Sequence, residues 1–163
     1  MLILGIDPGL ATLGFGLVEK KGNQFKAINY GTISTPASME NVKRLEKIFI
    51  ELNDLIKEYS PDHMAVEELF FNKNVKTAIK VGQARGVILL TGSRAGLNVK
   101  EYTPLQVKQS VVGYGRARKQ QVQRMVQTLL GLEDIPKPDD AADALAVSIC
   151  HGQSHSAQER WGI

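Results

Sequence analysis

The sequence has one cysteine, Cys150, among its 163 residues, and it has no long apolar run. A single cysteine excludes an internal disulfide bond and a metal site built from cysteines. No run approaches the roughly 20 apolar residues that a membrane-spanning helix needs. The apolar start at residues 2–6 follows no basic leader and meets Asp7 at once, which is not typical of a signal peptide. We therefore expect a cytoplasmic protein.

Linkers and internal repeats are also missing from the sequence, which favours one domain. With 43% hydrophobic and 23% charged residues, the chain has the composition of a protein that buries a core. We place a single domain at residues 1–151. Residues 152–163 are polar, and we expect them to form a flexible tail.

Positive charge is concentrated in one segment. Between Lys73 and Arg124 there are eleven Lys or Arg residues and one acid, a net charge of +10, whereas the rest of the chain has a net charge of −7. Such a segment is typical of a surface that binds a polyanion, because each neutralised phosphate releases condensed counterions. A solvated helix face explains any single lysine more simply, but the whole segment favours contact with nucleic acid.

The apolar pattern predicts an α/β fold. Short apolar runs bounded by turn residues predict strands at 2–6, 13–19, 25–33, 63–69 and 98–102. Helical spacing predicts helices over 40–59, 75–95, 103–112, 119–130 and 138–151. The first three strands have short connections, which form an antiparallel meander, and the later crossovers imply parallel strands. We predict a five-stranded mixed sheet, three antiparallel strands and then two parallel, flanked by helices.

Acidic residues stand where two predicted strands end and where the last helix begins. Asp7 follows the first strand in Gly-Ile-Asp-Pro-Gly, and Glu67 ends the fourth in Ala-Val-Glu. Asp140 and Asp143 are three residues apart and share one helix face, with small alanines beside them that allow close packing on the sheet. If the first and fourth strands are neighbours, all four carboxylates converge.

Four converging carboxylates repel one another unless divalent cations neutralise them. Oxygen ligands suit Mg²⁺ or Mn²⁺. Two such ions, about 4 Å apart, would bind the attacking and the leaving oxygen of a phosphodiester. The four acids therefore predict metal-assisted phosphodiester hydrolysis, with two Mg²⁺ ions per active site and Mn²⁺ as a substitute.

Single acids and histidines also fit simpler roles. Asp7 before Pro-Gly fits an ordinary turn. Asp139 and Asp140 fit caps at a helix start, which we favour for Asp139. His151 and His155, four residues apart, fit a pair of metal ligands, but a closed site needs further ligands.

Five segments together resemble the RuvC family, the bacterial crossover-junction endodeoxyribonucleases. They occur in the family's order, at residues 5–9, 65–67, 82–86, 107–113 and 140–146, and the resemblance runs from about Leu2 to His151. It implies an RNase H-like fold and a Mg²⁺-dependent endonuclease that resolves Holliday junctions in homologous recombination and DNA repair. It also implies a homodimer that makes paired symmetric nicks with 5′-phosphate ends, and RuvA and RuvB as partners.

The resemblance also implies roles for single residues. It implies that the catalytic metal ligands are Asp7, Glu67, Asp140 and Asp143. It implies that Phe70 stacks on junction bases, and that Lys108 and a catalytic Lys119 lie near the scissile phosphate. Phe70 also fits the core, because Phe71 is adjacent and one of the two should be buried. The basic segment adds these predicted DNA-binding residues: Lys73, Lys76, Lys80, Arg85, Arg116 and Arg118.

The predicted helix over 75–95 carries Gly82 and Gly86, with Ala78 one turn earlier. Each interior glycine costs about 1 kcal/mol relative to alanine, so close packing of this face is expected. Packing on the chain's own sheet explains the glycines as well as a dimer does. The resemblance favours a two-fold helix–helix interface, which suits the approximate two-fold symmetry of a four-way junction.

Three other functions stay open. An RNase H-like enzyme of ribosomal RNA processing has a similar opening motif. An actin-like ATPase has a similar Asp-Pro-Gly turn, but 163 residues hardly hold its two subdomains. A DNA-binding module without catalysis would use the acids as helix caps and would need no Mg²⁺.

Overall fold

A computed structural model describes residues 1–9, 11–69 and 74–162, without the side chains of residues 159 and 160. Its strands are β1 (Leu2–Pro8), β2 (Thr12–Lys21), β3 (Gln24–Ser34), β4 (His63–Glu67) and β5 (Asn98–Tyr102). Its helices are α1 (Asn41–Tyr59), α2 (Val75–Arg94), α3 (Pro104–Val112), α4 (Lys119–Leu130) and α5 (Asp139–Trp161). Except for the end of α5, the predicted bounds are correct to within two residues. Within the described ranges, none of these helices is both long and apolar enough to cross a membrane.

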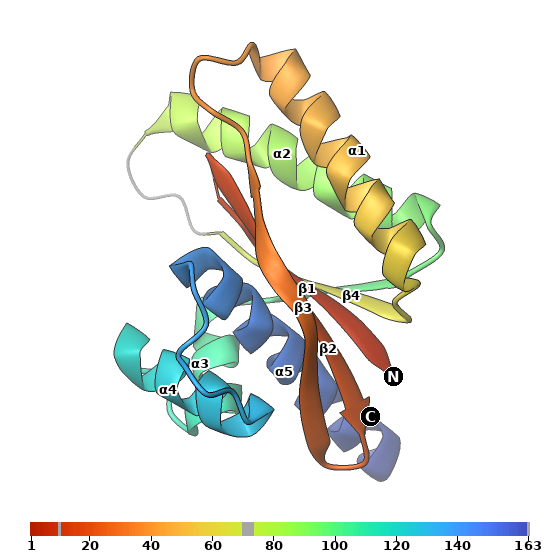
Figure 1. Ribbon diagram of the computed structural model, residues 1–163, viewed down its shortest axis with the longest axis vertical. Coiled ribbons are helices and arrows are strands. Elements are labelled where there is room, and N and C mark those ends of the chain that lie inside the picture. The colour runs from red at the N-terminus through yellow and green to blue at the C-terminus, as the bar shows by residue number, and fades with distance from the viewer. Residues whose placement is uncertain (10, 70–73, 163) are drawn as a thin grey trace.

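The strands form one sheet in the order β3-β2-β1-β4-β5. The pairs β3–β2 and β2–β1 are antiparallel, and β1–β4 and β4–β5 are parallel, as the sequence predicts. Helices α1 and α2 cover one face, and α3, α4 and α5 lie on the other (Figure 1). The first and fourth strands are therefore neighbours, which is the condition for the predicted carboxylates to converge.

Alternation along β1 and β4 decides which side chains face α5. Ile3 and Ala65 pack in one core with Leu145 of α5, whereas Leu4 and Met64 pack in the other core under α1 and α2. Because side chains alternate along a strand, Asp7 and Glu67 also lie on the α5 face. Both stand at the carboxyl end of their strands, opposite the first turns of α5.

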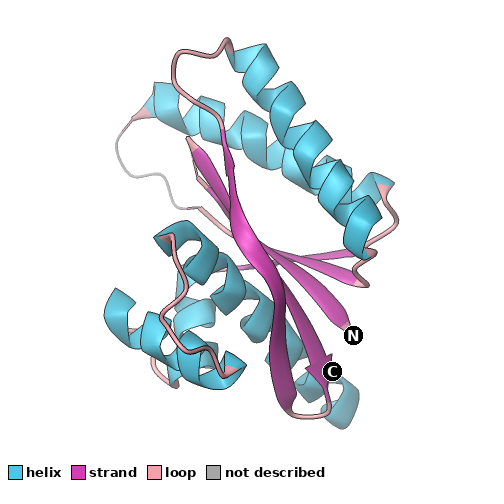
Figure 2. Cartoon of the chain, viewed as in Figure 1, coloured by secondary structure: helices cyan, strands magenta, loops and turns pink. Residues whose placement is uncertain are grey.

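Helix α5 ends ten residues later than predicted, at Trp161, so the predicted helix end at His151 is wrong (Figure 2). Its second half packs through polar contacts that leave no apolar pattern in the sequence. The ring of His151 is buried between the Tyr102 hydroxyl and the His63 ring, with Oη–Nδ1 and Nε2–Nδ1 distances of 2.8 and 2.7 Å. Gly152 packs against Phe25. Residues 152–161, expected as a polar tail, are therefore helical.

Candidate active site

Carboxylates from β1 and α5 meet at one end of the sheet. Oxygen atoms of Asp7, Asp140 and Asp143 all lie within 4.8 Å of one another. Glu67, at the end of the neighbouring β4, lies within hydrogen-bonding reach of Asp7 and completes the group. The structure thus brings together the four acids that the sequence predicted to converge.

Small residues bring α5 close enough to the sheet for these acids to meet. A Cβ atom at Gly14 of β2 would lie only 2.0 Å from the carbonyl oxygen of Asp140. A Cβ atom at Gly5 of β1 would lie 2.2 Å from the carbonyl oxygen of Ala144. The sequence predicts this approach from the alanines of α5, but the matching glycines of the sheet are equally necessary. Glycine inside a strand often marks such a close approach, which is the signal that the sequence offered.

The site has an excess of negative charge. Burial raises the pKa of Asp7 to about 8, and the neighbouring Glu67, Asp143 and Asp140 carboxylates add to the rise. Burial also raises the pKa of Glu67 and of Asp143, against the effect of nearby Lys119. This concentration of buried negative charge favours the binding of cations, which would lower the pKa values of the carboxyl groups again. Three converging carboxylate oxygens are also the hard ligands that Mg²⁺ and Mn²⁺ prefer, so these residues fit a divalent metal centre.

Two lysines flank the carboxylates. The Lys119 ammonium lies 3.2 Å from Asp139 Oδ2 and 3.4 Å from Asp143 Oδ2. The expected cap at Asp139 is wrong, because Pro138 is the N-cap residue and makes no side-chain cap bond. Asp139 instead accepts hydrogen bonds from Lys119 and, at 3.1 Å, from Gln123 of α4. It ties the start of α4 to the start of α5.

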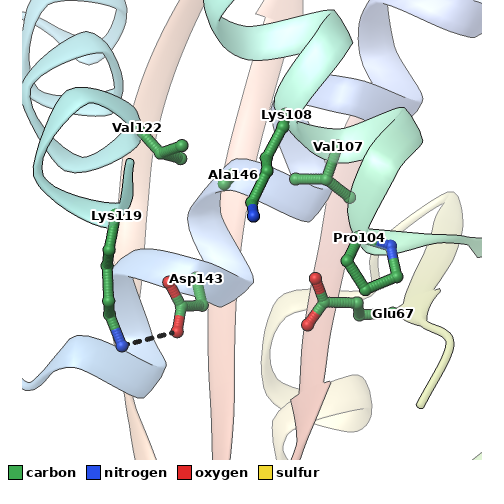
Figure 3. Close-up of a pocket in the computed structure, with 8 residues that line it drawn as sticks. All are labelled: Glu67, Pro104, Val107, Lys108, Lys119, Val122, Asp143 and Ala146. Atoms are coloured by element: carbon green, nitrogen blue, oxygen red, sulfur yellow. Dashed lines mark ion pairs between the residues drawn. The ribbon is translucent and has the colours of Figure 1, made fainter. Parts of the chain in front are cut away.

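Lys108 reaches the site from α3. This helix begins directly after β5 with a capping box, in which Thr103 and Gln106 each bond the other's backbone N–H. The Lys108 ammonium points into a cleft beside Glu67, and Lys119 stands across it beside Asp143 (Figure 3).

The cleft measures about 210 Å³. Its polar lining consists of Glu67, Lys108, Lys119 and Asp143, and its apolar lining of Pro104, Val107, Val122 and Ala146. Two cations and two carboxylates around one hollow suit a phosphodiester bound together with metal ions.

The other predicted DNA-binding residues lie in different places. Lys76 and Lys80 are exposed on α2, and Arg116 and Arg118 are exposed between α3 and α4. Phe70 and Lys73 lie outside the described residues. Arg85 donates through Nη1 to the backbone carbonyl of Glu67 and forms an ion pair with Glu101, so we do not include it in the proposed DNA surface.

The glycines of α2 face open space in the protomer. A Cβ atom at Gly82 or Gly86 would meet nothing within 4 Å. The interpretation that these glycines pack on the chain's own sheet is therefore wrong. They share an exposed helix face with apolar side chains, and we call this set the α2 stripe: Val75, Ile79, Gly82, Gly86 and Leu90.

Comparison with known proteins identifies the family. The family model described as crossover junction endodeoxyribonuclease RuvC matches residues 3–151. The RuvC proteins of Halothermothrix orenii and Heliobacterium modesticaldum are 64% and 61% identical over 162 and 163 residues, which are 99% and 100% of this chain and 98% of each relative. The structure of T. thermophilus RuvC in complex with a Holliday junction substrate has a TM-score of 0.89 and 32% identity, and the match covers 96% of each chain. This match confirms the predicted RNase H-like fold, and the chain belongs to the RuvC family of crossover junction endodeoxyribonucleases.

Proposed function

We propose that this chain resolves four-way DNA junctions by cutting two strands symmetrically in recombination and repair. The observation that carries the proposal is the convergence of Asp7, Asp140 and Asp143 within 4.8 Å, beside Glu67, in a chain of the RuvC family. The T. thermophilus relative, solved with a Holliday junction substrate, supports the choice of substrate.

The four carboxylates would hold two Mg²⁺ ions, or Mn²⁺ in their place. Divalent cations held there would supply the activation of the attacking water and the stabilisation of charge on the phosphate and the leaving oxygen. In their absence Asp7 keeps a proton, because its pKa of about 8 lies above neutral pH. The role of the acidic cluster is thus to bind cations, and a phosphate alone would be repelled.

The remaining residues of the cleft bind and orient the scissile phosphate. Lys108 and Lys119 stand on opposite sides of the hollow and would contact its non-bridging oxygens. Ion pairs with Asp139 and Asp143 keep the Lys119 ammonium at the edge of the cleft, where it would meet an incoming phosphate. Val107, Val122 and Ala146 form the apolar wall of the hollow beside these two lysines.

We propose that DNA approaches the cleft along exposed cations from two elements. Arg116 and Arg118 precede α4, and Lys76 and Lys80 lie near the start of α2. Phe70 and Lys73, which belong to the same predicted surface, stay predictions. Such contacts to phosphates give affinity that decreases steeply with salt.

The α2 stripe supports a homodimer. Apolar side chains and two glycines without neighbours form a continuous exposed face, and such a face is typical of a protein interface. A two-fold dimer would present two clefts to one junction. From the family resemblance we also propose RuvA and RuvB as partners, in the cytoplasm.

The function is tested by incubating the protein with a synthetic four-way junction, in the presence of Mg²⁺ or of EDTA. A DNA duplex and an RNA–DNA hybrid serve as control substrates. We expect paired nicks with 5′-phosphates in the junction, only with Mg²⁺. Asp143→Asn should abolish cleavage and leave junction binding intact, whereas Asp54→Asn, at an exposed acid on α1, should change neither. Tight binding without nicks would favour a binding module, and cleavage of RNA would favour a ribosomal RNA processing enzyme.

A further inference from the structure

Arg85 is a partly buried arginine that contacts the backbone of a metal-binding residue. Its Nη1 donates to the carbonyl oxygen of Glu67 at 2.8 Å, and its Nη2 forms an ion pair with Glu101 of β5. Only 17% of the Arg85 side chain is exposed. The guanidinium thus joins three elements, α2, β4 and β5, at the end of the sheet where the carboxylates meet.

The strand end that carries Glu67 has few other supports among the described residues. The pairs between β1 and β4 end at Ile6 and Val66, one residue before Glu67. On the other side Glu67 pairs with Tyr102 of β5, and the next residue, Glu68, donates its N–H to the Tyr102 carbonyl at 2.7 Å. Arg85 supplies the contact to Glu67 itself from the helix layer.

A guanidinium suits this position better than an ammonium. Its planar fork reaches two acceptors at once, here a carbonyl oxygen and a carboxylate, whereas lysine presents a single point of charge. The ion pair with Glu101 offsets the cost of burying the cation. Because the Glu67 side chain projects to the α5 face, fixing its carbonyl from the α2 side fixes the carboxylate without touching it.

We propose that Arg85 is a positioning residue that holds Glu67 in the geometry required for metal binding. On α2 it lies between the buried face, with Val81 and Ala84, and the exposed α2 stripe. It therefore links the helix that we propose as the dimer interface to the metal centre. The inference rests on the proposed metal-dependent cleavage, but its main test needs no DNA.

The test compares Arg85→Lys with Glu101→Gln. Arg85→Lys keeps the charge but loses the fork, whereas Glu101→Gln removes the ion pair and keeps the bond to the Glu67 carbonyl. For each variant we would measure Mn²⁺ binding by calorimetry without DNA, junction binding in EDTA, single-turnover cleavage and the melting temperature.

We expect Arg85→Lys to weaken Mn²⁺ binding by about 10-fold or more, the usual effect of losing a contact behind a metal ligand. It should slow cleavage at limiting Mg²⁺, with partial recovery at high Mg²⁺, and leave junction binding in EDTA unchanged. Glu101→Gln should lower the melting temperature about as much as Arg85→Lys does, but with little loss of Mn²⁺ affinity.

Two results would overturn the proposal. If the folded Arg85→Lys variant binds Mn²⁺ with wild-type affinity, the contact between Arg85 and the Glu67 carbonyl has only a structural role. A loss of junction binding in EDTA as large as the loss of cleavage would make Arg85 a DNA contact. If the wild-type protein fails to cut any junction, the proposed function fails, yet the Mn²⁺ affinities still decide the role of Arg85.

Discussion

Asp7 is an acid in an unfavourable place. Only 8% of the Asp7 surface is exposed, and three further carboxylates surround it. Its pKa of about 8 is far above the 3.8 of an ordinary aspartate, so the folded protein binds a proton here that the unfolded chain releases at much lower pH. Stability from this group is present at low pH and is lost as the pH rises from about 4 through about 8.

Because ionised Asp7 destabilises the fold at high pH, we predict that Asp7→Asn stabilises the metal-free protein in alkaline solution. The amide cannot ionise, so the repulsion among the acids decreases. In EDTA at pH 9 we expect the variant to melt about 2 °C or more above wild type, and the gap should shrink at pH 6. Mn²⁺ should stabilise wild type but not the variant.

Melting curves at the two pH values provide the measurement, with Asp54→Asn as the control because Asp54 is exposed on α1. If Asp7→Asn melts below wild type at pH 9 in EDTA, repulsion does not dominate at this site.

The acids were predictable and the arginine was not. Asp7 and Glu67 follow apolar strands, where a carboxylate is costly unless it is bound or solvated, and that cost is visible in the sequence. Arg85 belongs to the basic segment and to residues 82–86 of the family resemblance, but neither feature indicates which groups it contacts. Its partners, the Glu67 carbonyl and Glu101, are 18 and 16 residues away, and only the β4–β5 register brings them together.

At the scale of the elements, apolar spacing identified every strand and helix of the described chain, because their core faces are apolar. It failed in the second half of α5. There His151 and Gln153 are held by Tyr102, His63 and Ser110 through hydrogen bonds, and such contacts leave no periodic apolar signal. Polar packing, which depends on distant partners, is the part of this fold that the sequence pattern does not contain.

The contact between α5 and the sheet gives a prediction for Gly14→Ala. The added methyl group would overlap the Asp140 carbonyl, which belongs to a backbone that cannot rotate away. We expect α5 to move outward, the protein to lose about 1–3 kcal/mol of unfolding free energy, and the carboxylates to separate.

Urea denaturation and junction cleavage measure both effects. Cleavage should decrease at least about 10-fold at limiting Mg²⁺, as expected when metal ligands lose their positions. A variant that loses stability but keeps full activity would show that the metal centre tolerates movement of α5.

At the scale of the whole molecule, the α2 stripe and the active-site cleft are separate surfaces. Ile79 lies in the stripe and is 58% exposed, so Ile79→Asp should leave the protomer folded. A buried charge on each side of a two-fold contact would repel its copy, so we expect sedimentation to show a monomer. Paired nicking of a junction should then become single, uncoordinated nicking.

Ile50→Asp is the matched control for this prediction. Ile50 is also an exposed isoleucine, 48% accessible, but it lies on α1 outside the stripe. The control variant should sediment like wild type. If both variants behave alike, the dimer does not use the α2 stripe.

The four carboxylates come from residues 7, 67, 140 and 143, so the site is divided between the first half of the chain and its last helix. A nascent chain on the ribosome contains Asp7 and Glu67 long before Asp140 and Asp143 have been added. A product of premature termination before α5 likewise lacks two of the four proposed metal ligands, however well its first strands pair. The proposed site is therefore complete only once the last helix has been synthesised and has closed onto the sheet.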